Sequence, residues 1–113
     1  MTIYLAGPIT GNEGYRDEFK YAERELEGAG HDVLSPAWLP ERGLSYDAYI
    51  RIGIAMLAEC DAVCMLHGWE QSSGASMERA LAGVLGKKVL QFEEWMEKFE
   101  NWMEEWGDGS SET

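Results

Sequence analysis

The stretch that decides the fold is AVCMLHGWEQSSGASMERALAGVLG, residues 62–86. It begins with a short apolar run at 62–66, which predicts a buried strand, and then crosses a loop of small residues at 68–76. Apolar residues follow at helical spacing, at Met77, Ala80, Leu81, Val84 and Leu85. A strand, a small-residue loop and a helix in this order are typical of α/β proteins.

The same alternation continues on both sides of this stretch. Apolar runs predict three further strands, and helical spacing predicts two helices before the stretch, the second of them capped by Ser45. The strands are expected at 3–9, 32–35 and 88–92, and the helices at 15–26 and 46–58. Short strand–helix connections favour a parallel sheet with helices on both faces. We therefore predict a doubly wound, flavodoxin/Rossmann-like α/β fold with about four strands in the order 2-1-3-4.

This strand order also predicts where a ligand binds. In doubly wound sheets the ligand lies at the carboxyl ends of the strands where the order reverses, here between the first and third strands. The loops that meet there are 7–12 and 68–76, which are rich in Gly, Ser and Thr. Their glycines also fit a purely structural role in turns. The first loop has neither the P-loop nor the dinucleotide fingerprint, so neither site is predicted.

Glu78 is a carboxylate expected beside these loops, in or near the first turn of its helix. The positive end of a helix dipole keeps a carboxylate ionised, and an ionised carboxylate can act as a nucleophile or a base. Acidic residues early in a helix also stabilise the helix itself, and this structural interpretation stays open. A capping box would favour the structural role, but position 75 is Ala rather than Ser or Thr.

Length and composition indicate one globular domain at 1–106 with a disordered tail at 107–113. The formal net charge of −12 opposes binding along a nucleic acid, and no apolar run approaches the length of a membrane span. The chain enters its first strand without a secretory signal, so we expect a cytoplasmic protein with reduced thiols at Cys60 and Cys64. No metal or cofactor is predicted, because His31 and His67 have no partners at ligand spacing.

The C-terminal segment 92–106 has the pattern of an acidic amphipathic helix. Its apolar stripe, which is separated by glutamates, consists of Phe92, Trp95, Met96, Phe99, Trp102, Met103 and Trp106. Such a stripe packs either on its own domain or against a second subunit, since an exposed one would be sticky. We predict a homo-oligomer, a dimer or higher.

Four segments together resemble the nucleoside 2-deoxyribosyltransferase superfamily: IYLAGPITG at 3–11, AGHDV at 29–33, CDAV at 60–63 and SSGASME at 72–78. In motif they are closest to its deoxynucleoside 5'-monophosphate N-glycosidase branch and to small phage and bacterial relatives. The resemblance covers residues 3–92. It implies cleavage or transfer of the N-glycosidic bond of a 2'-deoxynucleoside 5'-monophosphate.

The resemblance also implies roles for single residues. Glu78 matches the family's nucleophile, and Ser72 matches a position that is Asp in transferases of free nucleosides and Ser in 5'-monophosphate hydrolases, where it helps to hold the phosphate. Further substrate contacts are expected at Gly7, Pro8, Ile9, Gly11 and Gly74.

One position departs from the family pattern. The family commonly has an Asp that helps to protonate the leaving base where this chain has Gly53, so Gly53→Asp is expected to raise base release. Substitutes from the same helix are Tyr46, Asp47 or Tyr49, and Trp38 and Trp69 are candidates for stacking on a base or for core packing. Two alternatives remain open: a nucleotide-binding protein with little turnover, and an interaction protein that uses its acidic aromatic C-terminal helix.

Overall fold

The computed structural model describes residues 1–111, with side chains described through residue 105. Four parallel strands form one sheet in the order β2-β1-β3-β4, which confirms the predicted fold class and strand order. Their bounds are β1 (Thr2–Ala6), β2 (Asp32–Leu34), β3 (Ala62–Met65) and β4 (Lys88–Gln91). The first strand ends earlier than the predicted 3–9, because Pro8 has no N–H group to donate to a neighbouring strand.

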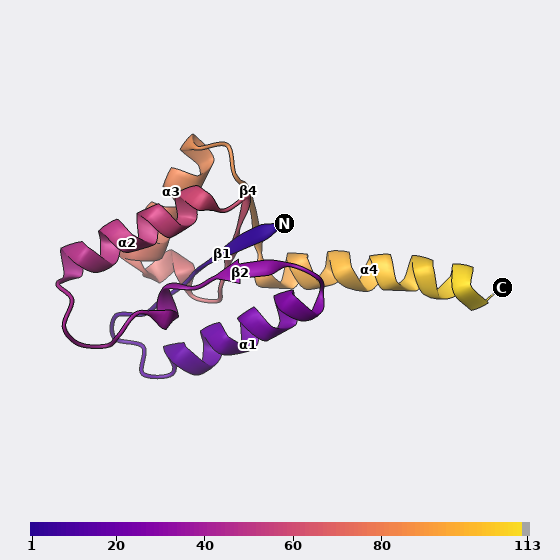
Figure 1. Cartoon of the computed structure of the whole chain (residues 1–113), viewed down its shortest axis with the longest axis horizontal. Coiled ribbons are helices and arrows are strands. Elements are labelled where there is room, and N and C mark those ends of the chain that lie inside the picture. Colours follow the sequence, from indigo (N-terminus) through magenta and orange to yellow (C-terminus); the bar gives the residue numbers. More distant parts are fainter. Residues whose placement is uncertain (112–113) are drawn as a thin grey trace.

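Helices cover both faces of the sheet (Figure 1). On one face lie α1 (Tyr15–Gly28) and α4 (Phe92–Ser111), and on the other lie α2 (Tyr46–Glu59) and α3 (Ser73–Val84). Two short 3-10 turns, η1 (Pro36–Trp38) and η2 (Trp69–Gln71), follow β2 and β3. The predicted cap of α2 is confirmed, since the Ser45 hydroxyl accepts a hydrogen bond from the Ala48 N–H at 3.1 Å.

The central strand β1 is buried on both faces, as its continuous apolar run indicates. Ile3 and Leu5 pack toward α1 and α4, whereas Tyr4 and Ala6 pack toward α2 and α3. This alternation carries the Tyr4 hydroxyl to the α2–α3 side of the sheet, where the site described below lies. Cys60 and Cys64 are buried free thiols, as expected, and they lie in the cores on opposite faces of the sheet.

The first part of α4 packs on the domain and the rest leaves it (Figure 1). Trp95 is 4% exposed and its indole N–H donates to the Val63 carbonyl at 3.3 Å. Farther along, Trp102 is 51% and Met103 50% exposed. The expectation that the stripe packs on its own domain therefore holds for its first part, and the association of subunits stays a prediction. The side chain of Trp106 lies outside the described residues.

The backbone of α4 continues to Ser111, so it reaches into the segment 107–113 that the sequence predicts to be a disordered tail. Residues 112 and 113 of that segment lie outside the described part of the chain. Within the described residues, no helix combines the length and the apolar character needed to cross a membrane.

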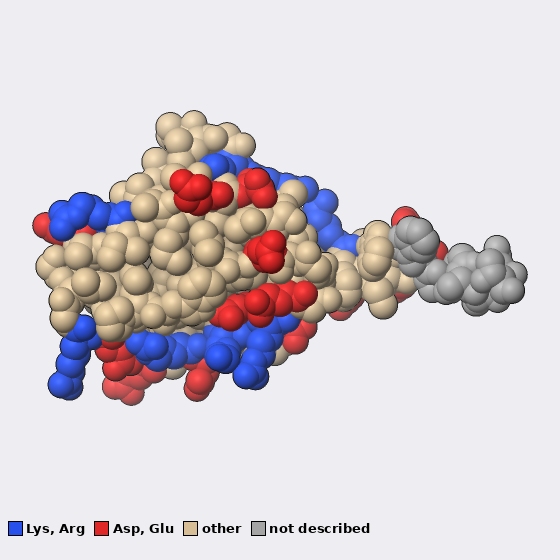
Figure 2. Space-filling model, in the orientation of Figure 1, with Lys and Arg blue, Asp and Glu red and all other residues tan. Residues whose placement is uncertain are grey.

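The charged side chains are interleaved in sign on the face shown in Figure 2. Along the lower edge of this view, blue groups lie next to one another with red groups above and below them.

Candidate active site

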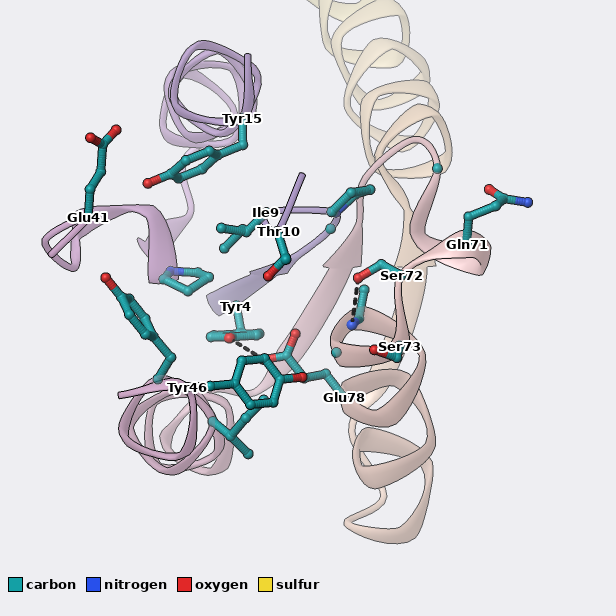
Figure 3. A pocket seen from close by; sticks show the side chains of 18 residues that line it. Tyr4, Ile9, Thr10, Tyr15, Glu41, Tyr46, Gln71, Ser72, Ser73 and Glu78 are labelled. Atoms are coloured by element: carbon teal, nitrogen blue, oxygen red, sulfur yellow. Dashed lines mark hydrogen bonds between the residues drawn. The ribbon is translucent and has the colours of Figure 1, made fainter. Parts of the chain in front are cut away.

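A cavity of about 650 Å³ opens at the carboxyl ends of β1 and β3, where the strand order predicts a ligand site. Its walls come from the loop after β1, from α2 and from the start of α3 (Figure 3). Six of the seven predicted site residues line it, namely Gly7, Pro8, Ile9, Ser72, Gly74 and Glu78. Gly11 is not among the lining residues.

Gly7 follows β1 and lies against Leu66, which follows β3. A Cβ atom at this position would lie 2.8 Å from the Cβ of Leu66, which is closer than side chains come. The backbone of Leu66 also bonds to β1, because its N–H donates to the Ala6 carbonyl at 2.8 Å. Gly7 therefore lets the two site loops leave the sheet side by side.

Glu78 is the sixth residue of α3 and thus lies in its second turn, which corrects the expectation that the helix start keeps it ionised. The dipole effect falls off within the first turn. Burial instead raises the pKa of Glu78 to about 7. A hydrogen bond from Tyr4 lowers this pKa, but its effect is smaller than that of burial. Both the protonated and the ionised form of this carboxyl are consequently populated near neutral pH.

Tyr4 donates its hydroxyl hydrogen bond to Oε2 of Glu78. Burial first, and the charge of Glu78 second, raise the pKa of Tyr4 above its ordinary value, so the phenol stays protonated and remains a donor. In the sequence, Tyr4 is simply one residue of an apolar strand. The missed signal is that a fully buried tyrosine needs a partner for its hydroxyl.

Gly53 faces this pair from α2. A Cβ atom at position 53 would lie 3.1 Å from both Glu78 Oε2 and the Tyr4 hydroxyl. We call Tyr4, Gly53 and Glu78 the floor of the cavity. The floor has no room for a carboxylate on α2 unless the pair moves, so Gly53→Asp is no longer expected to raise base release.

Three tyrosines form an aromatic wall, which we define as Tyr15, Tyr46 and Tyr49. Tyr46 and Tyr49 lie one helical turn apart on α2, on the face that also presents Gly53, and Tyr15 comes from α1. Asp47, on the same helix, is not among the lining residues.

The tryptophans considered for base stacking do not line the cavity. The indole N–H of Trp38 donates to Glu23 at 2.8 Å, and the guanidinium of Arg79 lies 5.8 Å from the ring centre of Trp69. The tyrosines of the aromatic wall, rather than these tryptophans, are therefore the aromatic surfaces available to a ligand in the cavity.

The opposite side of the cavity is the start of α3 (Figure 3). Ser72 is its N-cap, with a hydroxyl that accepts from the Ala75 N–H at 3.2 Å. A serine hydroxyl that accepts a hydrogen bond still has its own proton to donate. Ser73 and Gly74 also line the cavity, and their amides precede the first intrahelical bond, which Ser76 donates to the Ser72 carbonyl. We call Ser72, Ser73 and Gly74 the anion end, because donors at a helix start suit a negatively charged group.

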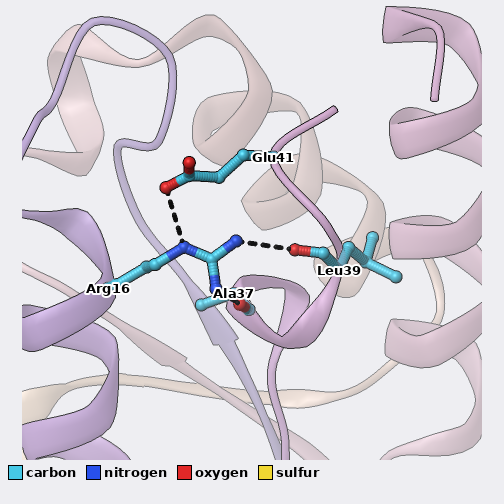
Figure 4. A network of polar contacts seen from close by, with 4 residues as sticks. All are labelled: Arg16, Ala37, Leu39 and Glu41. Atoms are coloured by element: carbon cyan, nitrogen blue, oxygen red, sulfur yellow. Dashed lines mark hydrogen bonds and ion pairs between the residues drawn. The ribbon is translucent and has the colours of Figure 1, made fainter. Parts of the chain in front are cut away.

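Arg16 fixes the loop that closes the remaining side (Figure 4). Its guanidinium donates to the carbonyls of Ala37 at 3.2 Å and Leu39 at 3.0 Å, and it pairs with Glu41 at 3.0 Å. These contacts hold η1 and Glu41 at the edge of the cavity. Arg16 itself does not line the cavity, and among the described residues that do, none is Lys, Arg or His.

Comparisons with known proteins identify one family and several proteins of similar fold. A family model described as "Domain of unknown function (DUF4406)" matches residues 1–91. No curated protein matches the sequence.

Several solved structures share the fold. A 2-deoxyribosyltransferase from the psychrotolerant bacterium Bacillus psychrosaccharolyticus is 26% identical with a TM-score of 0.65, over 80% of this chain and 71% of that one. A CMP N-glycosidase from Clostridium botulinum is 22% identical with a TM-score of 0.61, over 80% of this chain and 70% of that one. A 2-deoxyribosyltransferase from Leishmania mexicana is 23% identical with a TM-score of 0.64, and the match covers 80% of this chain and 62% of that enzyme.

Proposed function

The chain belongs to the DUF4406 family, and we propose that it is an enzyme that cleaves or transfers the N-glycosidic bond of a 2'-deoxynucleoside 5'-monophosphate. The similar structures are described as deoxyribosyltransferases and an N-glycosidase, which supports glycosyl transfer in general. The observation that carries the proposal is the floor of the cavity, where the half-buried carboxylate of Glu78 accepts a hydrogen bond from the buried Tyr4. The cavity volume of about 650 Å³ is in the range of small-molecule sites.

Glu78 is the proposed nucleophile. Its ionised carboxylate attacks the anomeric carbon while the base departs, which forms a glycosyl ester that water or a second base then resolves. Tyr4 acts as a positioning residue, because its hydrogen bond fixes Oε2 and leaves the other oxygen of Glu78 for attack. The same hydrogen bond favours the ionised carboxylate that attack requires.

The two sides of the cavity suggest how the nucleotide lies over the floor. The anion end offers the Ser72 hydroxyl and two backbone amides to the 5'-phosphate. The aromatic wall, on the other side of Glu78, offers ring surfaces to the base. The sugar then spans the floor with its anomeric carbon near Glu78.

The test is base release by the purified chain from each of the four deoxynucleoside 5'-monophosphates. We expect release from at least one of them and none from the Glu78→Gln variant, which keeps the shape of the side chain but not its nucleophilicity. Circular dichroism checks that the variant is folded. Binding without release by the parent would instead support a nucleotide-binding protein, and equal release by parent and variant would remove Glu78 from the mechanism.

We also propose that two copies associate through the part of α4 that leaves the domain. Its exposed Trp102 and Met103 continue the stripe whose first part, at Trp95, is already buried. A symmetric contact would cover this stripe and leave the glutamates in solvent. Trp102→Glu is expected to convert a dimer into a monomer in light scattering. A parent protein that is monomeric at micromolar concentration would contradict the proposal.

A further inference from the structure

The floor of the cavity holds no group that can give a proton to a leaving base. Position 53 is a glycine, and a Cβ atom added there would lie 3.1 Å from Glu78 Oε2 and 3.1 Å from the Tyr4 hydroxyl. Tyr4 already directs its proton to Glu78. Glu78 itself must be ionised to attack, so it cannot be the acid in the same step.

Among the other described residues that line the cavity, none brings a carboxyl, imidazole or thiol group near the floor. Among the described lining residues none is Asp, His, Cys or Lys, and the one other carboxyl group is Glu41. Glu41 lies at the edge of the cavity, away from Glu78, where Arg16 engages its Oε1 (Figures 3 and 4). The remaining candidates are the phenols of the aromatic wall, which are weak acids compared with carboxyl and imidazole groups.

We propose that the site takes N-glycosides whose base is already cationic, such as a 7-alkylated purine or a pyridinium nucleotide. This inference rests on the proposed function, since it uses Glu78 as the nucleophile. A neutral base departs with the electron pair of the glycosidic bond and needs a proton to avoid leaving as an anion. A cationic base needs none, because that electron pair neutralises its charged ring nitrogen.

The step balances without an acid. A bond forms between a Glu78 oxygen and the anomeric carbon, the bond to the ring nitrogen breaks, and the base leaves as a neutral molecule. Water then attacks the anomeric carbon of the ester, which gives the free sugar phosphate and a protonated Glu78. That proton passes to solvent before the next turnover.

The walls of the cavity agree with a ligand that carries opposite charges at its two ends. Tyrosine faces attract cations, and the aromatic wall has three of them. No Lys, Arg or His among the described lining residues opposes a positive base there. The anion end, on the opposite side, provides amide and hydroxyl donors to the phosphate of the same molecule.

The experiment compares 2'-deoxyguanosine 5'-monophosphate with its 7-methylated form, which differ in the methyl group and the positive charge of the base. Base release is followed at neutral pH with the parent chain. Release by Glu78→Gln is subtracted for each nucleotide, because the methylated form also loses its base spontaneously. We expect kcat/KM to be about 10²-fold or more higher for the methylated nucleotide, since general acid assistance is typically worth 10² to 10⁴.

The outcomes separate this inference from the proposed function. Release of unmethylated base as fast as methylated base, dependent on Glu78, would overturn the inference and leave the proposed function standing. No Glu78-dependent release from either nucleotide would overturn both.

Tyr46→Phe and Tyr49→Phe test whether a phenol serves as the acid. Both variants keep the ring face, so any change in binding should affect the two nucleotides alike, and we expect the ratio of their kcat/KM values to stay within about threefold of the parent ratio, far less than the loss of an acid would cause. A selective loss of release from the unmethylated nucleotide in either variant would identify a proton donor and overturn the inference.

Discussion

The floor of the cavity and its anion end differ in how tightly their atoms are packed. On the floor, Tyr4 and Glu78 contact each other, and a single added carbon at Gly53 would press on both. At the anion end, Ser72 caps a helix and faces the cavity, and a Cβ atom added at Gly74 would meet no atom within 4 Å. Changes on the floor should therefore alter the chemical step, whereas changes at the anion end should alter affinity.

The largest effect is expected from Gly53→Ala. The new methyl group must displace the carboxylate of Glu78 or the hydroxyl of Tyr4 by a few tenths of an ångström. Because misplacing a reacting group by about 1 Å can cost 10²-fold in rate, we predict a fall in kcat between about tenfold and 10²-fold with little change in KM. Gly83→Ala is the matched control, because a Cβ atom at that position in α3 meets nothing within 4 Å.

The control should keep the activity of the parent and gain about 0.5 to 1 kcal/mol of stability, the usual difference between Gly and Ala inside a helix. If Gly53→Ala folded and retained the kcat of the parent, the floor would be less tightly packed than its distances indicate.

Tyr4→Phe should have the next largest effect, and it should change a pH profile. The Tyr4 hydrogen bond lowers the pKa of Glu78, so its loss raises that pKa above the parent value of about 7. Less Glu78 is then ionised at neutral pH, and the acidic limb of the plot of kcat/KM against pH moves to higher pH. The loss at pH 7 should be about tenfold or more, as expected for a hydrogen bond to a charged group. An acidic limb that stays in place or moves to lower pH would contradict the role of Tyr4.

Ser72→Ala should have the smallest effect on the chemical step, because its loss is confined to affinity. Loss of one hydrogen bond to phosphate should weaken binding of a 5'-monophosphate by about 0.5 to 3 kcal/mol and leave binding of the free nucleoside nearly unchanged. Because Ser72 also caps α3, Ser45→Ala serves as the control, since it removes the corresponding cap of α2 outside the cavity. Calorimetric titration that finds equal losses for the two ligands would remove the phosphate role of Ser72.

The sequence was sufficient for the architecture because each element has a strong local signal. Apolar runs marked the four strands, Ser45 marked a helix start, and the strand order followed from the short crossovers. The same strand order predicted that the loops at 7–12 and 68–76 meet at one edge of the sheet. The strand order also predicted that Gly7 and Glu78, 71 positions apart, would line one cavity.

The floor could not be predicted in the same way, because it depends on contacts between elements that are distant in sequence. The bond between Tyr4 and Glu78 joins residues 74 positions apart, and a tyrosine in an apolar run gives no sign of its partner. The pKa of Glu78 likewise depends on burial rather than on its place in the helix. Gly53 was recognised as a departure from a family pattern, but the space around it required the packed structure.

The covalent bond between Glu78 and the sugar is central to the proposed mechanism. The most direct test is mass spectrometry of the chain, quenched with acid during turnover of the best substrate and then mapped by peptide digestion. We predict an added mass equal to one deoxyribosyl phosphate on the peptide that contains Glu78, and no such adduct in Glu78→Gln. An adduct on a different residue, or rapid base release by the Glu78→Gln variant, would contradict the claim.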